Sequence, residues 1–398
     1  EVTAVGSLGR GDSPVHIVVG GGVWGTWTAL WARRLGANVT LLEANEPGHA
    51  KSTSGDHSRI IRHAHGTDDL LAGWAQRSLA AWLDLESLTG ASIFVPTGVA
   101  WCVSDEGVWE RESEVRLRAA SVPVERLTPD EAVHRWPSMS AERLKSVLHE
   151  PTAGFLRAGA GVRAAARALA EEGGVVVRGS ATAAADGRPL DENGTPIAAG
   201  AVVWACGPWL PALFPDLVGR GCEAEIAPVR RDAIYFAAPD MEIGAAPTWV
   251  DEGQRAWGMP GDGPRGVKVG PELDAGSFDP SQWPDEAHPS SVAAARAAGG
   301  LRFPAIANAP IVESRACQHE RTKSGHYVLD HHPRNRRAFI AGGGSGHGYK
   351  QGPAVGEYAA RAALGIDPIA APDRRFAITQ RESGPESPMG DMGAPTQG

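Results

Sequence analysis

The chain has few of the residues and patterns that mark metal-binding, nucleic-acid-binding or membrane-spanning proteins. Its 398 residues include only four cysteines, Cys102, Cys206, Cys222 and Cys317, which are far apart and form neither a C-x-x-C pair nor a Cys/His pattern. Such spacing predicts no structural zinc and is typical of a protein from a reducing cytoplasm. We therefore expect no metal site and a cytoplasmic location.

An excess of positive charge is also absent, because 38 Lys and Arg stand against 47 Asp and Glu for a net charge of −9. Basic residues form no run interleaved with aromatics, so we expect neither nucleic acid nor an anionic membrane as a partner. No apolar stretch approaches the roughly 18 residues of a transmembrane helix. Residues 1–14 predict a flexible leader without a signal peptide, and 376–398 predicts a disordered tail.

A glycine motif near the start of the chain lies between a predicted strand and a predicted helix. Val15–Val19 is apolar and rich in β-branched residues, and it is followed by Gly20, Gly22 and Gly25 in the order G-x-G-x-x-G. From residue 23 to 35, apolar residues recur at a helical spacing. If a dinucleotide binds here, Gly20 permits a tight turn, Gly22 lets the backbone approach a pyrophosphate, and Gly25 lets helix and strand pack closely.

An acid completes this unit, since a second predicted strand, 39–42, ends in Glu43. A carboxylate there accepts hydrogen bonds from both ribose hydroxyls and disfavours a 2′-phosphate, so the pattern favours FAD or NAD over NADP. The free N–H groups at the helix start, at Val23 and Trp24, are expected to face the phosphates. The alternative is an ordinary β-turn-helix unit without a ligand.

The rest of the chain predicts two kinds of sheet. After an Ala-rich helix at 161–172, strands at 175–177 and 201–205 resume the parallel βα pattern, and a strand at 338–341 runs into a glycine-rich loop. Between 226 and about 310, short strands alternate with turns, which is typical of an antiparallel sheet. We predict an α/β fold (α+β overall), with a discontinuous Rossmann-like nucleotide domain and a second, substrate domain. The first comprises 15–89, 150–225 and 311–375, and the second 90–149 and 226–310.

The segment 48–66 is too long and too charged for a plain connection, and it predicts contact with an anionic ligand. Its motif S-G-D-H-S-R-I-I-R-H-A-H-G resembles that of the monomeric sarcosine oxidase family, FAD-dependent amine oxidases within the D-amino-acid oxidase group. The resemblance runs from His16 to about Asp373 and makes the Rossmann-like part an FAD-binding domain. The further motifs are W-G-M-P (257–260), G-V-K-V-G (266–270), R-A-C (315–317), D-H-H-P (330–333) and G-S-G-H-G-Y-K (344–350).

The resemblance implies roles for three cations. Arg59 would lie by the flavin ring, and Arg62 and Lys350 would hold the substrate carboxylate. Lys350 would also stand near the flavin pyrimidine edge and neutralise the anion that forms on reduction. Ile60 and Ile61 between the arginines predict partial burial, where an arginine needs an anion. The alternatives are a solvated basic loop and a surface lysine.

Lys268 lies in the apolar stretch G-V-K-V-G, where a charge is costly unless it is used. It resembles the family lysine that holds a water over the flavin and promotes electron transfer to oxygen, because a nearby cation stabilises superoxide. The alternative is a lysine on the solvent-facing side of an alternating strand.

Cys317 resembles the cysteine that carries FAD through an 8α-thioether in this family. A thiolate attacks the 8-methyl carbon once the ring is in its quinone-methide form, which a nearby cation favours. His319 and Glu320 stand where the family usually has a Tyr and a Thr. A buried, inert cysteine is the alternative.

Two other pocket positions depart from the family pattern. Trp257 stands in place of a tyrosine, and Glu272 in place of a histidine four residues after the lysine. An added aromatic wall and a carboxylate favour an amine that is bulkier or more basic than sarcosine. We expect Trp257, His319 and Glu272 to contact the substrate, whereas His347 either contacts the flavin or only shapes its loop.

These features together predict an FAD-dependent amine oxidase, a monomer or weak homodimer. It would transfer a hydride from the carbon beside a secondary (N-methyl or cyclic) or primary amine of an amino-acid-like substrate to flavin. O2 would be the acceptor, with imine or aldehyde and H2O2 released. Open alternatives are a dehydrogenase with another acceptor, a non-catalytic flavin-binding subunit, and an NAD-dependent dehydrogenase. Lys268, Arg59 and Lys350 are the predicted catalytic residues. The predicted cofactor contacts are Gly20, Gly22, Val23, Trp24, Gly25, Glu43, Ser58, Arg59, Val176, Cys206, Gly207, Cys317, Gly344, Gly346, His347, Gly348 and Lys350.

Overall fold

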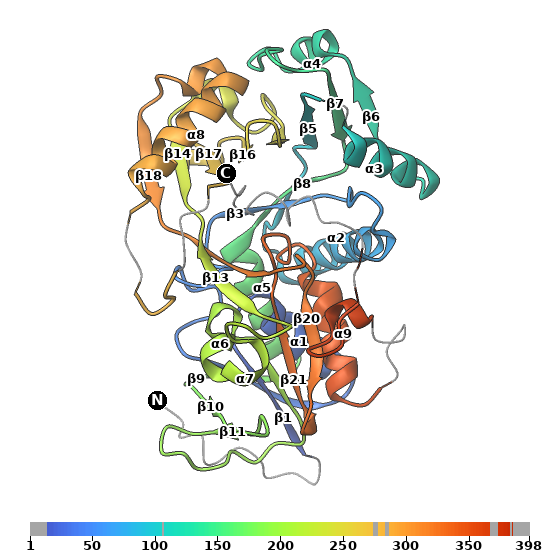
Figure 1. The fold of residues 1–398 in the computed structure, drawn as a ribbon, viewed down its shortest axis with the longest axis vertical. Coiled ribbons are helices and arrows are strands. Elements are labelled where there is room, and N and C mark those ends of the chain that lie inside the picture. Colours follow the sequence, from blue (N-terminus) through green and yellow to red (C-terminus); the bar gives the residue numbers. More distant parts are fainter. Residues whose placement is uncertain are drawn as a thin grey trace.

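Two domains are stacked along the long axis of the molecule, each built on its own sheet (Figure 1). The computed structural model describes residues 14–105, 107–273, 278–282, 286–366, 373–382 and 384. A six-stranded sheet forms the nucleotide domain and an eight-stranded, mainly antiparallel sheet forms the substrate domain. The predicted α/β class with two different sheets is therefore confirmed.

The nucleotide domain is organised around strand β1, which pairs in parallel with β2 and β12. Its alternating residues Ile17 and Val18 are buried in the cores on opposite faces of the sheet, as an apolar central strand requires. All neighbours are parallel except β20, which is antiparallel to β21. In sheet order the strands are β20 (Val328–His332), β21 (Asn335–Gly342), β12 (Val202–Trp204), β1 (Val15–Val19), β2 (Asn38–Glu43) and β9 (Val175–Arg178).

Helices cover one face of this sheet, and short elements cover the other. Helices α1 and α9 pack so closely that a Cβ on Gly356 would lie 2.6 Å from the backbone of Trp27. The helices on this face are α1 (Val23–Arg34), α2 (Asp69–Thr89), α5 (Ala158–Glu171) and α9 (Gly352–Ala363). The opposite core receives η2 (Gly207–Trp209), α6 (Leu210–Leu213) and α7 (Pro215–Val218).

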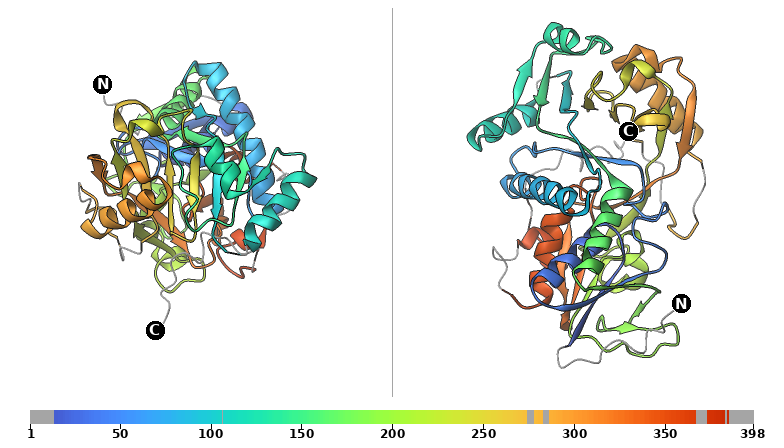
Figure 2. Two further views of the ribbon diagram at one scale, coloured as in Figure 1. Left: turned by 90° about the horizontal axis from the view of Figure 1, so that it is seen from above. Right: turned by 180° about the vertical axis from the view of Figure 1, so that it is seen from behind.

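Two separate stretches of chain build the substrate sheet. Its neighbours are antiparallel except β15 and β5, which join the two halves in parallel. Seen from behind in Figure 2, the halves stand side by side above α2. In order the strands are β18 (Ile311–Arg315), β14 (Ala233–Phe236), β17 (Val267–Pro271), β16 (Ala256–Met259), β15 (Thr248–Asp251), β5 (Val99–Val103), β7 (Ser146–Glu150) and β6 (Glu125–Leu127). Its helices are α3 (Val108–Ala119), α4 (Pro129–Arg135) and α8 (Pro289–Arg302).

Small sheets lie between and beside the domains. Strand β13 leads from the nucleotide domain into the substrate sheet (Figure 1). The small sheets are β3 (Ser58–Ile61), β8 (Gly154–Arg157) and β4 (Phe94–Val95); β13 (Ile226–Arg230) and β19 (Gln318–Thr322); and β10 (Thr182–Ala183) and β11 (Pro189–Leu190). Further 3-10 turns are η3 (Pro239–Met241), η4 (Gly263–Arg265), η5 (Pro304–Ile306) and η6 (Arg374–Phe376).

Two domain boundaries differ from the prediction. Residues 311–315 form β18, which pairs with β14, so they belong to the substrate sheet and not to the nucleotide domain. The predicted tail begins too early, because Phe376 and Ile378 are only 1% and 2% exposed. Phe376 stacks on Tyr327, with ring centroids 5.7 Å apart. Residues 1–13 of the predicted leader (1–14) and residues 385–398 of the predicted tail lie outside the described residues.

Within the described ranges, no helix combines the length and the apolarity needed to cross a membrane.

Candidate active site

A cavity of about 490 Å³ opens where the glycine motif turns from β1 into α1. Gly20 has φ +104°, and a Cβ there would lie 2.4 Å from the carbonyl oxygen of Ala205. A Cβ on Gly25 would lie 1.8 Å from the carbonyl oxygen of Gly20. These two positions admit only glycine, which leaves a narrow backbone cradle at the carboxyl edge of the parallel sheet.

The start of α1 faces this cavity with polar groups. Gly22 is the N-cap and provides no side-chain cap, while Ser54 Oγ accepts a hydrogen bond from Val23 N at 3.0 Å. Glu43 accepts from Gly21 N at 2.5 Å and from Asn45 N at 2.9 Å. The predicted cofactor residues that line the cavity are Gly20, Gly22, Val23, Trp24, Glu43, Arg59, Cys206, Gly207, Gly344, Gly346 and Gly348.

A smaller cavity of about 70 Å³ adjoins the first and reaches toward the substrate sheet. Arg59, His319, Gly346 and Tyr349 line both cavities, so the two share one wall. A ligand in the larger cavity can therefore meet a second molecule in the smaller one.

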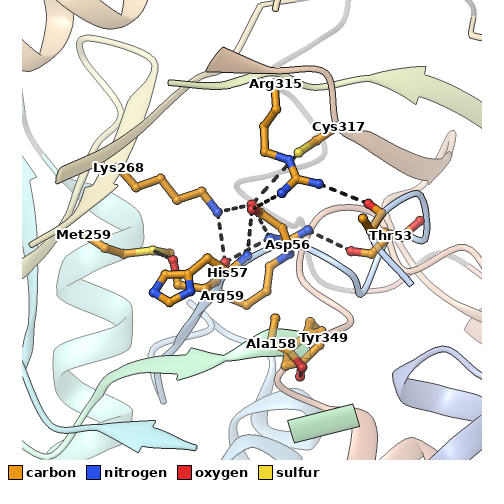
Figure 3. A network of polar contacts seen from close by, with 12 residues as sticks. Thr53, Asp56, His57, Arg59, Ala158, Met259, Lys268, Arg315, Cys317 and Tyr349 are labelled. Atoms are coloured by element: carbon orange, nitrogen blue, oxygen red, sulfur yellow. Dashed lines mark hydrogen bonds and ion pairs between the residues drawn. The ribbon is translucent and has the colours of Figure 1, made fainter. Parts of the chain in front are cut away.

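Asp56 is the centre of a buried polar network beside this shared wall (Figure 3). It accepts from Lys268 Nζ, from Arg59 Nη1 at 2.8 Å and from the hydroxyl of Tyr235 at 2.8 Å. Arg315 Nη1 lies 3.5 Å from the same carboxylate. Burial alone raises the pKa of Asp56, but the three cations together hold it well below its usual range. One carboxylate thus faces three cations, and the cluster is net positive.

Lys268 is buried beside Asp56. It is 1% exposed, donates to the carbonyl oxygen of Ser58 at 3.0 Å, and lies 5.2 Å from the ring centre of Trp257. It is not among the described residues that line either cavity, whereas its neighbours Asp56 and Trp257 line the smaller one. Burial lowers the pKa of Lys268 and Asp56 raises it, with a net fall.

Arg62 and Lys350 both line the smaller cavity and are 6% and 2% exposed. Arg62 donates to Ala64 O and lies 4.9 Å from the ring centre of Trp101, and Lys350 donates to His347 O at 2.9 Å. Among the described residues neither forms an ion pair. Burial lowers the pKa of Arg62 to about 10, and burial and Arg62 lower that of Lys350 well below its usual range. Two buried cations without a bound anion form a site for a carboxylate.

Glu150 is a buried acid that holds the backbone next to Arg62. It is fully buried and accepts from Trp101 Nε1 at 2.8 Å and from the backbone amides of His63 and Ala64 at 2.7 and 3.1 Å. Its charge raises the pKa values of Arg62 and Lys350 against the larger effect of burial.

His347 uses both ring nitrogens within the chain. Nδ1 pairs with the hydroxyl of Tyr327 at 2.8 Å, and Nε2 pairs with Gly325 O at 3.0 Å. Its ring lines the smaller cavity only, while its carbonyl oxygen receives Lys350. The geometry favours the loop-shaping alternative and ties the position of Lys350 to Tyr327.

Cys317 lies at the network, with Sγ 4.0 Å from Asp56 Oδ2. Burial, followed by the charge of Asp56, raises the pKa of its thiol to about 11, although Arg59, Arg315 and Lys268 act in the opposite direction. The thiol is thus mostly protonated near neutral pH, and the cations beside it are the groups that would favour a thiolate.

Besides Lys268 and Gly25, three further predicted contacts lie away from both cavities. Ser58 turns its hydroxyl to Met259 Sδ at 2.9 Å. Val176 is 36% exposed on the outer strand β9, and residues 179–181 after that strand reach the cavity instead. Glu272 accepts from Trp257 Nε1 at 2.8 Å and pairs with Arg231 at 3.3 Å, so it braces the wall and is not free to meet a substrate amine. Trp257 and His319 do line the smaller cavity.

The sequence prediction missed several residues of the site. Asp56 and Ser54 were visible in the quoted S-G-D-H-S-R motif, whose acid precedes Arg59 by three residues. Glu150 and Arg231 stand in apolar strands or beside them without a local pattern that singles them out. No group of three or more His, Cys, Asp or Glu suited to a metal ion occurs within the described residues.

The larger cavity fits FAD by several independent features. Gly20 and Gly25 admit no Cβ, Gly22 brings no side-chain cap to the start of α1, and Glu43 ends β2 at the cavity edge. One oxygen of a buried lining residue, Glu320 Oε2, has no hydrogen-bond partner among the described residues.

Comparison with known proteins agrees with this geometry. A model of the FAD dependent oxidoreductase family matches residues 16–362. The chain is 27% identical over 362 residues to the monomeric sarcosine oxidase of Bacillus sp. (strain B-0618), covering 87% of this chain and 91% of that one. It is 26% identical over 369 residues to the N-methyl-L-tryptophan oxidase of Salmonella agona (strain SL483), covering 88% and 95%.

Solved structures share the fold. The L-proline dehydrogenase from P. horikoshii matches with a TM-score of 0.79 at 21% identity, covering 92% of this chain and 96% of that one. The glycine oxidase from Geobacillus kaustophilus gives 0.77 at 20% identity, covering 93% and 100%. Since the family model spans most of the chain and the cradle fits its cofactor, the chain belongs to the FAD dependent oxidoreductase family, as a distant homologue of monomeric sarcosine oxidase and N-methyl-L-tryptophan oxidase.

Proposed function

We propose that this flavoprotein is an amine oxidase for an amino-acid-like substrate, with O2 as acceptor and H2O2 and an imine or aldehyde as products. The observation that carries the proposal is the pair Arg62 and Lys350, two buried cations without an ion pair among the described residues, in a cavity that adjoins the dinucleotide cavity. A substrate carboxylate between them orients the neighbouring C–N group toward the shared wall.

The substrate is a secondary (N-methyl or cyclic) or primary amine with an apolar side chain. Trp101, Val250, Trp257 and Met259 line the smaller cavity. Among the relatives, one is named for a small amine, sarcosine, and another for a large one, N-methyl-L-tryptophan, and we propose a substrate within this range of sizes. Glu272 is already bonded to Trp257 and Arg231, so it is not available to pair with a second positive charge on the substrate. The proposal of a bulkier substrate therefore rests on contact with aromatic side chains.

FAD, when bound, supplies the acceptor for the hydride removed from the carbon beside the amine nitrogen. The chain supplies positive charge, because Arg59 on the shared wall and Lys268 and Arg315 behind it surround a single carboxylate, Asp56. That excess stabilises negative charge arising beside the wall during turnover. A covalent link through Cys317 and a reducing cytoplasmic setting are further parts of the proposal; all four cysteines are unpaired.

An anaerobic screen of N-methyl, cyclic and aromatic amino acids tests the central proposal. We expect one class to bleach the flavin absorbance and to produce peroxide when air is admitted. The Lys268→Met variant should be bleached at a similar rate but release peroxide more slowly. Lys323→Met, at a side chain that is 74% exposed, is the matched control. A flavin that no amine bleaches would favour the non-catalytic subunit.

The dehydrogenase alternative has one specific observation in its favour. Lys268 is held by Asp56 and Ser58 O and lines neither cavity, so a direct role toward oxygen requires Asp56 to release it. Substrate-dependent bleaching with no peroxide in air would select this alternative. For the covalent link, yellow colour in an acid-denatured pellet supports it, and colour only in the supernatant contradicts it.

A further inference from the structure

Glu320 is a buried acid in the wall of the larger cavity that the proposed chemistry does not use. It lies on β19, is 8% exposed, and reaches the cavity between Gly207 and the loop before α9. Oε1 accepts from Gly344 N at 3.2 Å, whereas Oε2 has no partner among the described residues. A Cβ on Gly207 would lie 3.5 Å from Oε2, so this buried oxygen lies beside the Gly207 backbone in the cavity wall.

The surroundings of Glu320 favour its neutral form. Burial raises the pKa of the carboxyl to about 7, and only the backbone amides of Gly344 and Gly343 act in the opposite direction. The titratable side chain that faces it is Cys206, whose thiol pKa is itself raised by burial and by Glu43 and Glu320. Among the described residues no cation pairs with Glu320. A neutral carboxyl in this place carries an O–H for which the described residues provide no acceptor.

A dinucleotide presents the acceptors that this group lacks, because its phosphate, hydroxyl and carbonyl oxygens all accept hydrogen bonds. An ionised carboxylate would instead bring a second negative charge to the pyrophosphate within a low-dielectric cavity. We propose that Glu320 is an FAD-binding residue that donates a hydrogen bond from its neutral carboxyl to an oxygen of the cofactor, and that its ionisation weakens the noncovalent binding of FAD. This inference rests on FAD occupying the larger cavity.

The consequence is a pH-dependent affinity that follows from linkage. If FAD binds only the protonated form, the dissociation constant rises about tenfold per pH unit once the pH exceeds the pKa of the free protein. With a pKa of about 7, the expected rise between pH 7 and 9 is about 50-fold, and binding at pH 8 takes up about 0.9 proton.

The test uses the full chain with Cys317→Ser, which keeps FAD binding reversible. FAD dissociation constants are measured by flavin fluorescence from pH 6 to 9, with folding checked by circular dichroism at each pH. We expect the steep rise in this parent protein. Adding Glu320→Gln, which keeps a neutral donor, should flatten the curve to within about threefold. Adding Glu110→Gln, at another buried acid of raised pKa that lies on α3, should leave the rise intact.

The same rise in the Glu320→Gln protein, or a flat curve in the parent, would overturn the inference. Proton uptake gives a second readout that needs no substitution at Glu320. Calorimetric titration of the parent at pH 8 in buffers of different ionisation enthalpy should report uptake of about one proton per FAD, and no uptake would likewise overturn the inference. A parent that binds no FAD at any pH would instead refute FAD binding in the cavity itself, which is a separate failure.

Discussion

The substitution Asp56→Asn tests whether one carboxylate balances the cations behind the shared wall. It keeps the size of the side chain and removes the charge that Lys268, Arg59 and Arg315 face. Asparagine also turns an amide donor toward at least one of these cations. The three positive groups would then keep mainly backbone carbonyl partners, which are Ser58 O for Lys268 and Arg59 and Ala50 O for Arg315.

The magnitude follows from the cost of breaking a buried ion pair, which is about 3–5 kcal/mol. Because Asp56 is 3% exposed and shared by several cations, we expect a loss of about 4 kcal/mol in unfolding free energy at pH 7, or about a 1,000-fold larger unfolded fraction. Asp56 has a pKa held well below its ordinary value, so its ionisation stabilises the fold above the unfolded pKa and this contribution is lost as pH falls through the folded pKa. The gap between the two proteins should therefore close in acid.

The chemical readout is the pH dependence of the reaction of reduced enzyme with oxygen, followed by stopped flow. Asp56 raises the pKa of Lys268 against burial, so its removal lowers that pKa further. Any decline in rate that reports loss of the Lys268 proton should move to lower pH in Asp56→Asn. Asp251→Asn is the matched control, because Asp251 and Arg302 form another fully buried pair, 2.7 Å apart, away from both cavities. It should cost similar stability and leave the profile in place.

Two results would refute this reasoning. Equal unfolding free energies for the wild type and Asp56→Asn would show that the carboxylate does not balance the cluster. An unchanged pH profile in a folded Asp56→Asn protein would show that Asp56 does not control Lys268.

Three further predictions concern the cradle, the C-terminal segment and the carboxylate site. Gly25→Ala should abolish FAD binding measured by fluorescence, because its Cβ would lie 1.8 Å from Gly20 O, and normal FAD binding by this variant would contradict the prediction. The control is Gly73→Ala in α2, whose Cβ meets nothing within 4 Å. This control should stabilise the protein by about 0.5–1 kcal/mol in denaturant unfolding. Phe376→Ala should cost about 3–5 kcal/mol of unfolding free energy, and a loss below 1 kcal/mol would show that this segment is not part of the core. The dissociation constant of a simple carboxylic acid, read from the flavin spectrum, should rise with pH as Lys350 loses its proton, because the pKa of Lys350 lies well below its ordinary value. Lys350→Met should remove this pH dependence. A dissociation constant that still rises with pH in this variant would exclude Lys350 as the source.

Local patterns predicted the nucleotide half of the site well. The glycine spacing, the β-branched strand and the terminal acid are all set within 29 residues of Val15, and each fixes backbone geometry on its own. The structure accordingly places Gly20, Gly22, Val23, Trp24 and Glu43 along one cavity.

The charge balance behind the shared wall could not be predicted in the same way. Asp56 lies in a segment that predicts contact with an anionic ligand, whereas its actual partners include Lys268, which is 212 positions away, and Arg315. The local motif shows an acid three residues before Arg59, but it does not show which distant cations the acid meets. Strand periodicity around Lys268 likewise says which face of the strand a residue occupies and not which side chain lies against it.

Composition also misled the prediction at the end of the chain. The Gly- and Pro-containing residues after 382 dominated the interpretation of 376–398, although Phe376 and Ile378 are apolar. The partners of Phe376, Trp74 and Tyr327, come from α2 and from the residue before β20, so the packing is invisible to any local window. Val176, predicted as a cofactor contact, lies on β9, which is the outer strand of its sheet.

The parallel junction between β5 and β15 also affects how the protein is made. On the ribosome, β5 emerges long before β15, because α5, β9, β12 and β14 are synthesised between them. At a synthesis rate of about 5–20 residues per second, the edge of β5 stays unpaired for roughly 7 to 30 seconds until β15 has been made. During that time a fully buried apolar strand of the finished enzyme is available to other nascent chains. Soluble yield should therefore depend more on translation speed and chaperone supply than on the stability of the completed enzyme.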